Sequence, residues 1–128
     1  MARVLVIDDD PQIRHLLRTV LEQAHYQVGE APDGAVGLRL FKEQRFDLVI
    51  TNIFMPEKEG IETITDIRAE DQHTPVLAMS GGGSSGGTDV LQTAMAFGAT
   101  ATLAKPFDID VLTARVDELL RGSASQRV

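Results

Sequence analysis

Short apolar runs alternate along the chain with longer segments in which apolar residues recur every three or four positions. Residues 4–7 form a continuous aliphatic run ended by acidic residues and a proline, which is typical of a strand buried on both faces of a parallel sheet. Pro11 then opens a segment with the i, i+3, i+4, i+7 spacing of one buried helical stripe, at Ile13, Leu16, Leu17, Val20 and Leu21. Arg14 and Arg18 fall on the other side of this helix. The pattern therefore predicts a strand followed by a helix that covers a sheet.

The same alternation repeats to the end of the chain. Strands are expected at residues 27–31, 48–51, 76–79 and 101–104, and helices at 34–44, 61–67, 90–97 and 109–120. Five such units with short connections require parallel strands, right-handed crossovers and helices on both faces. We therefore expect an α/β fold, with a single five-stranded parallel sheet flanked by helices. In such sheets the functional crevice lies beyond the carboxyl ends of the strands.

Length and composition indicate one globular domain. The 128 residues are 43% hydrophobic and 24% charged, which suits one hydrophobic core. The domain is expected over residues 1–121, followed by a polar tail at residues 122–128. With 12 basic and 19 acidic residues, the net charge of -7 opposes attraction to a phosphate backbone, so direct nucleic-acid binding is not expected.

The cysteine count and the first residues exclude further classes of protein. The absence of cysteine excludes disulfides and thiolate metal sites. The first apolar run is too short for a signal sequence or a membrane span, so we expect a cytoplasmic protein that does not bind membranes. The sequence does not indicate an oligomeric state.

Polar residues follow the predicted strands at the edge where function is expected. In chain order they are Asp8, Asp9, Asp10, Asn52, Ser80 and Lys105. Carboxylates suit a hard divalent cation, whereas a hydroxyl and an ammonium suit phosphate oxygens. The constellation therefore favours a site for a metal and a phosphoryl group.

Several of these residues also have ordinary structural explanations. Asp10 before Pro11 fits an N-cap that precedes proline in the first turn of a helix. Ser80 and Asn52 could each begin a turn, and Lys105 could be an exposed lysine. Asp8 and Asp9 are harder to explain in this way, because adjacent carboxylates repel each other unless a cation offsets them. The placement of all these polar residues at the ends of predicted strands is therefore what indicates a functional site.

In these motifs the sequence resembles the response regulator receiver family of bacterial two-component systems. The matching segments, which run in order through residues 3–120, are residues 4–11 (Val-Leu-Val-Ile-Asp-Asp-Asp-Pro), residues 47–56 (Asp-Leu-Val-Ile-Thr-Asn-Ile-Phe-Met-Pro) with Gly60, then Ser80, Gly98-Ala99 and residues 105–107 (Lys-Pro-Phe). The resemblance implies a flavodoxin-like (βα)5 fold with strand order 2-1-3-4-5 and a cis peptide bond between Lys105 and Pro106.

The resemblance also implies roles for the strand-end residues. Asp8 and Asp9 would hold Mg²⁺ together with the side chain at position 52 and the backbone carbonyl of Phe54. Asn52 occupies the phosphoacceptor position, Ser80 would be the switch hydroxyl, and Lys105 would contact the phosphoryl group. The implied partners are a sensor histidine kinase or histidine phosphotransfer protein and a downstream protein target.

Three features depart from the family pattern. Thr102 stands where the family has an aromatic switch residue, and the glycine-rich segment 81–87 is longer than usual and expected to be mobile. The third departure is Asn52, because an amide oxygen is a poor nucleophile and carries no charge for Mg²⁺. As written, the chain should not be phosphorylated at this position. Asn52 is then either an engineered substitution or the mark of a natural divergent receiver.

Three functions remain open on the sequence. The first is a phosphorelay receiver module, which is not an enzyme; the second is a pseudo-receiver that binds proteins independently of phosphorylation. The third is a haloacid-dehalogenase-like phosphatase, suggested by Asp8-x-Asp10 at the end of the first strand. The three histidines, His15, His25 and His73, lie on different elements without metal-binding spacing and are expected to be at the surface or partly buried.

Overall fold

The computed structural model describes residues 2–53, 60–81 and 87–126, which form five strands and five helices. The strands are β1 (Arg3–Ile7), β2 (Gln27–Ala31), β3 (Leu48–Asn52), β4 (Val76–Gly81) and β5 (Ala101–Lys105). The helices are α1 (Pro11–Gln23), α2 (Gly34–Glu43), α3 (Gly60–Glu70), α4 (Gly87–Ala96) and α5 (Ile109–Gln126). All neighbouring strands pair in parallel, in the order β2-β1-β3-β4-β5. The predicted fold class and strand order are confirmed.

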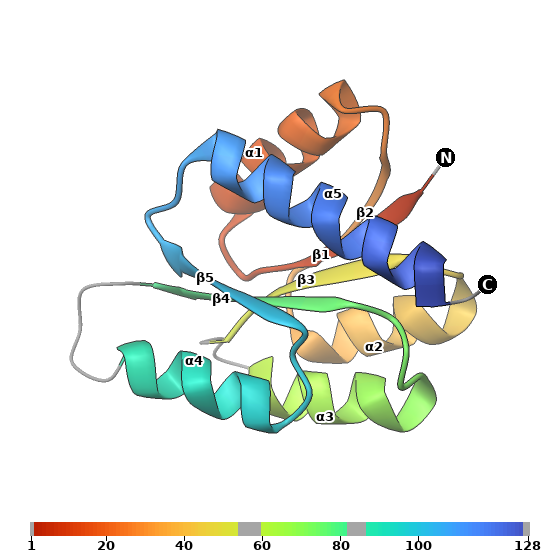
Figure 1. Cartoon of the computed structure of the whole chain (residues 1–128), viewed down its shortest axis with the longest axis vertical. Helices are drawn as coiled ribbons and strands as arrows, with labels where there is room; N and C mark the ends of the chain where they lie inside the picture. Colours follow the sequence, from red (N-terminus) through yellow and green to blue (C-terminus); the bar gives the residue numbers. More distant parts are fainter. Residues whose placement is uncertain (1, 54–59, 82–86, 127–128) are drawn as a thin grey trace.

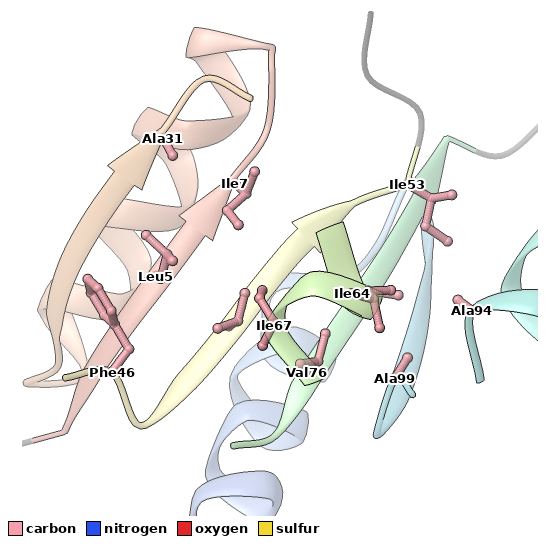
Figure 2. Close-up of a cluster of buried hydrophobic side chains, with 12 residues drawn as sticks. Leu5, Ile7, Ala31, Phe46, Ile53, Ile64, Ile67, Val76, Ala94 and Ala99 are labelled. Atoms are coloured by element: carbon pink, nitrogen blue, oxygen red, sulfur yellow. The ribbon is translucent and has the colours of Figure 1, made fainter. Parts of the chain in front are cut away.

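The sheet separates two hydrophobic cores. Helices α1 and α5 cover one face, and α2, α3 and α4 cover the other (Figure 1). Successive strand residues point to opposite faces, so Val4 and Val6 join the core under α1 and α5, whereas Leu5 and Ile7 join the other core. Figure 2 shows this second core, where Ile64 of α3 lies against the sheet. The central strands are thus buried on both faces, as their unbroken apolar runs predicted.

Three helices are longer than their apolar periodicity indicated, and one of them is α3, which spans Gly60–Glu70 where residues 61–67 were predicted. Helix α4 begins at Gly87, before the predicted residue 90, and α5 continues to Gln126. A helix that has already formed can extend through small and polar residues at little cost when no proline stops it. The division between a domain at residues 1–121 and a tail at 122–128 stays a prediction. Most of segment 81–87 lies outside the described residues, so its expected mobility stays a prediction too.

A half-buried arginine holds together the segments that lead into β4 and β5. Arg68 donates hydrogen bonds to the carbonyl oxygens of Thr74 at 2.6 Å and Gly98 at 2.8 Å, and to the hydroxyl of Thr100 at 3.2 Å. Burial lowers the pKa of Arg68. Gly98 has φ +123°, and a Cβ atom there would lie 2.7 Å from Cγ of Arg68, so only glycine fits. This clamp joins α3 to the segments that precede β4 and β5.

Tyr26 ties the connection between α1 and β2 to α5. Its hydroxyl donates a hydrogen bond to the carboxylate of Asp117, 91 residues away along the chain. Burial, followed by the hydrogen bond to Asp117, raises the pKa of Tyr26 to about 12. The phenol is therefore more stable in its protonated form when the chain is folded.

The raised pKa of Tyr26 makes stability depend on pH in the alkaline range. Its contribution is fully present below the ordinary tyrosine pKa of about 10 and is lost as the pH rises through about 12. We expect Tyr26→Phe to lower the unfolding free energy by roughly 1–2 kcal/mol near pH 8, with this difference narrowing as the pH rises from about 10 through about 12. Because the chain has one tyrosine and no tryptophan, tyrosinate absorbance follows this group directly. A native titration midpoint near 10 would contradict the assignment.

Candidate functional site

The structure brings the predicted strand-end residues to one edge of the sheet. Asp8 directly follows β1, Asn52 ends β3, and Lys105 ends β5. Ser80 lies in β4 opposite Ala104, one position before the pairing of Gly81 with Lys105. Because the strands are parallel, all four residues share the carboxyl edge. Phe54, whose carbonyl was expected to join the metal site, lies outside the described residues.

Asp8 is the most tightly held residue of this edge. Its backbone N–H donates to the carbonyl oxygen of Ala31 at 3.1 Å, and its own carbonyl accepts from Arg14 at 2.7 Å. Its carboxylate accepts from the backbone N–H of Asp10 at 2.9 Å and from Nζ of Lys105 at 2.9 Å. The side chain is only 1% exposed. A buried carboxylate is stable only when its oxygens are paired, and both oxygens of Asp8 are.

The ion pair between Lys105 and Asp8 joins residues 97 positions apart. The Lys105 side chain is 18% exposed, so solvent screens the pair only in part. The peptide bond between Lys105 and Pro106 is cis, which confirms the expectation from the resemblance. The pair fixes the end of β5 against the end of β1 across the two strands that lie between them.

Asn52 is buried, with 6% exposure, and faces the exposed Asp9. Its amide Nδ2 donates a long hydrogen bond of 3.4 Å to Oδ1 of Asp9. An aspartate at position 52 could not donate this bond at neutral pH, and it would add a negative charge beside Asp9. The amide thus offers a hydrogen-bond donor to the Asp9 carboxylate, where an aspartate side chain would repel it.

Asp10 has the structural role that its position before Pro11 suggested. It is the N-cap of α1, and its side chain accepts from the backbone N–H of Gln12 at 2.9 Å. This confirms the capping interpretation. Both carboxylates of the Asp8-x-Asp10 motif in the phosphatase hypothesis therefore already have hydrogen-bond partners within the protein.

The donor set at this edge suits a divalent cation only in part. Asp8 and Asp9 supply two carboxylates, whereas the amide of Asn52 turns a hydrogen-bond donor toward Asp9. Within residues 2–53, 60–81 and 87–126, no group of three or more His, Cys, Asp or Glu residues could hold a metal ion. The two acids therefore fit Mg²⁺, but the side chain at position 52 contributes no charge to binding it.

Ser80 supplies a hydroxyl at the same edge. It is 1% exposed, and its Oγ has no hydrogen-bond partner among the described residues. A buried hydroxyl without a partner costs free energy, and such groups often mark a site where another ligand is received. Thr102 pairs with Ala78 in the sheet and is half-buried. The last strand thus carries a small polar residue at the expected aromatic position.

Two contributors to the site had no clear signal in the sequence. Arg14 was placed on the solvent side of α1, but it reaches back to the Asp8 carbonyl and lies 3.4 Å from Glu30. Gly60 begins α3 so close to β3 that a Cβ atom would lie 2.3 Å from the carbonyl oxygen of Asn52. Gly60 appeared in the matching motif, but its role depends on contacts that no local pattern reveals.

The three histidines lie apart from this edge. His15 is on α1, His25 follows α1 with φ 71°, and His73 precedes β4. All three are exposed, as expected. No helix in the described part of the chain is long and apolar enough to cross a membrane.

The family model for the response regulator receiver domain matches residues 4–117. The chain belongs to this family. Receivers are signalling modules of phosphorelays rather than classical enzymes, and they work with histidine kinases or phosphotransfer proteins. The match spans β1 to α5 and includes every strand-end residue described above.

Individual relatives agree with this assignment. The chain is 37% identical over 123 residues to the transcriptional regulatory protein PrrA of Mycobacterium tuberculosis, covering 96% of this chain and 52% of that protein. It is 32% identical over 118 residues to the sporulation initiation phosphotransferase F of Bacillus subtilis, covering 92% of this chain and 93% of that protein. The chain thus spans about half the length of the PrrA regulators it matches.

Solved structures show the same fold. A response regulator receiver domain protein from Clostridium thermocellum superposes with a TM-score of 0.91 at 29% identity, covering 98% of this chain and 99% of that chain. The chemotaxis protein CheY4 of Vibrio cholerae gives a TM-score of 0.84 at 32% identity, covering 93% of this chain and 98% of that chain. The (βα)5 receiver architecture is therefore shown by sequence and by structure.

The ion pair at the site should contribute strongly to stability. We expect Lys105→Met to lower the unfolding free energy by roughly 2–4 kcal/mol, because it leaves the buried Asp8 carboxylate with one unpaired oxygen. Lys42→Met is a matched control, since Lys42 pairs with Glu70 at 3.3 Å with both side chains exposed, and it should cost less than about 1 kcal/mol. Denaturant titration measures both. Equal losses in the two variants would show that the Asp8 pair is not special.

Proposed function

We propose that this chain is the receiver module of a phosphorelay whose phosphoacceptor position carries Asn52, so that the chain as written accepts no phosphoryl group. The observation that supports the proposal is the position of Asn52, buried at the end of β3 and hydrogen-bonded to Asp9. The Asp8–Lys105 ion pair lies at the same edge of the sheet. We further propose that the protein acts in the cytoplasm and passes its signal by contact with a downstream protein.

The proposed chemistry explains why the residue at position 52 matters. A carboxylate oxygen there would attack the phosphorus of a phosphohistidine, forming an O–P bond as the N–P bond breaks and the imidazole leaves with the electron pair. The amide oxygen of Asn52 shares its lone pair with the C–N bond and is a much weaker nucleophile. When bound at Asp8 and Asp9, a divalent cation would neutralise charge on the phosphoryl oxygens.

Lys105 and Ser80 would act on the phosphoryl group once it is attached. Lys105 would move its ammonium from Asp8 toward a phosphoryl oxygen, since both are anionic acceptors. Ser80 would donate its buried hydroxyl, which has no partner among the residues that the structure describes. Both side chains could thus bind a phosphoryl group, but Asn52 does not supply the carboxylate to which that group would be attached.

A second candidate function is a pseudo-receiver that binds its partner without phosphorylation. Two contacts favour this function, the hydrogen bond from Asn52 to Asp9 and the ion pair between Lys105 and Asp8. They give both carboxylates a polar partner without a metal or a phosphoryl group. Comparing the partner affinity of the chain with that of its Asn52→Asp variant, with and without phosphodonor, separates the two candidates. The first requires a phosphorylation-dependent change, whereas the second requires tight binding by the chain as written.

The phosphoacceptor assignment predicts a gain of chemistry. We expect Asn52→Asp to gain one phosphoryl group from acetyl phosphate in the presence of Mg²⁺, because the variant supplies the missing nucleophile. The chain as written and an Asn52→Ala variant should gain none. Intact-mass spectrometry reads all three. Equal labelling of the chain as written, or no labelling of Asn52→Asp, would contradict the assignment.

Position 52 should also link stability to metal. At about 4 Å and an effective dielectric near 20, a like-charge pair costs on the order of 4 kcal/mol before solvation offsets it, so a net loss of roughly 1–2 kcal/mol is expected for metal-free Asn52→Asp. Saturating Mg²⁺ should narrow or reverse this difference, because the third carboxylate tightens cation binding. Thermal melts with Mg²⁺ and with chelator test this. A stability difference that does not respond to Mg²⁺ would contradict a role of position 52 in binding the cation.

A further inference from the structure

Arg14 connects the β1–α1 turn to β2. Its Nη1 donates to the carbonyl oxygen of Asp8 at 2.7 Å, and its Nε lies 3.4 Å from Oε1 of Glu30. The Arg14 and Glu30 side chains are 18% and 27% exposed, so both are largely enclosed. A planar guanidinium can serve both partners at once from fixed directions, which the single ammonium of a lysine cannot do.

The carbonyl that Arg14 holds belongs to the peptide between Asp8 and Asp9. The Asp8 side chain is fixed independently, by Lys105 and by the N–H of Asp10. Asp9 is exposed, and its described side-chain contact is the long hydrogen bond from Asn52. The orientation of the Asp8–Asp9 peptide plane therefore sets the direction in which the Asp9 carboxylate leaves the backbone, and Arg14 restrains that plane.

We propose that Arg14, held by Glu30, is a positioning residue for the divalent-cation site, which it serves by aiming the Asp9 carboxylate toward Asp8. The inference rests on the proposed function, which places the cation at Asp8 and Asp9. The charge of Arg14 alone would repel a cation, and Glu30 offsets it. The Arg14–Glu30 pair can therefore orient the Asp9 carboxylate with little net repulsion of the cation.

Arg18 offers a matched control on the same helix. It contacts the other oxygen of Glu30 at 2.5 Å and also pairs with Glu22, and the hydrogen bond to Glu30 raises its pKa. Its side chain is 42% exposed, and no described contact joins it to Asp8. Arg14 and Arg18 therefore share a residue type, a helix and an acidic partner, and they differ in the contact to the backbone carbonyl.

The test is Mg²⁺ affinity, measured by isothermal titration calorimetry in the full chain carrying Asn52→Asp. In that background, Arg14→Lys and Arg14→Gln should each weaken Mg²⁺ binding by about tenfold, as loss of a residue that orients metal ligands typically does. Arg18→Gln should change affinity less than about twofold. Glu30→Gln should weaken binding, and adding it to Arg14→Gln should have little further effect because the two residues act as one unit.

The alternatives give opposite results. If Arg14 acts only through its charge, Arg14→Gln should tighten Mg²⁺ binding and Arg14→Lys should leave it unchanged; either result overturns the inference. If Arg14 only supports the fold, its variants should lower the metal-free melting temperature without changing Mg²⁺ affinity, which overturns it too. Failure of the Asn52→Asp parent to bind Mg²⁺ would overturn both the inference and the proposed function. Normal binding by the parent and by both Arg14 variants would overturn the inference alone.

Discussion

The buried carboxylate of Asp8 is the constraint on which the site depends. This burial is stable only because every polar atom of the residue has a partner, and those partners come from β2, from α1 and its N-cap Asp10, and from β5. Lys105 is the most distant of them in sequence and the only formal cation that reaches the carboxylate among the described residues. The carboxyl ends of β1 and β5 are thus linked by this ion pair as well as by the hydrogen bonds of the two strands between them. A ligand that draws Lys105 away from Asp8 must replace that positive charge, and a divalent cation can do so.

Position 52 sets the charge of this edge without changing its shape. Asparagine and aspartate have nearly the same size, so the packing of Gly60 against the Asn52 carbonyl does not depend on which is present. What differs is the charge and the direction of hydrogen bonding, because the amide donates to Asp9 whereas a carboxylate would repel it. Under the proposed function, the chain therefore keeps the receiver scaffold but lacks the carboxylate nucleophile at position 52.

The sequence predicted the fold well because each strand and helix has its own local signal. The apolar run at residues 48–51 predicted a strand buried on both faces, and β3 is buried along its whole length. The strand order and the site roles came from the family resemblance, since periodicity does not reveal which strands are neighbours. Arg14 shows where prediction failed: its helical face indicated solvent, but its length lets it fold back to Asp8 and meet Glu30 on β2. Such a contact joins a helix to a strand elsewhere in the sequence, so the spacing of residues along the helix does not indicate it.

The two ends of the sheet are stabilised by different means, and this division suits a signalling domain. At the amino ends of β4 and β5, Arg68 donates to backbone carbonyls and glycine leaves room for it, so these interactions involve no acceptor that a bound ligand would displace. At the carboxyl ends, Lys105 is held by a carboxylate that another anion could replace, and Ser80 keeps a hydroxyl with no partner among the described residues. Rearrangement therefore costs less at the carboxyl edge than at the amino edge. A phosphoryl group bound at the carboxyl edge could move Lys105 and Ser80 while the clamp at Arg68 keeps both strands in place.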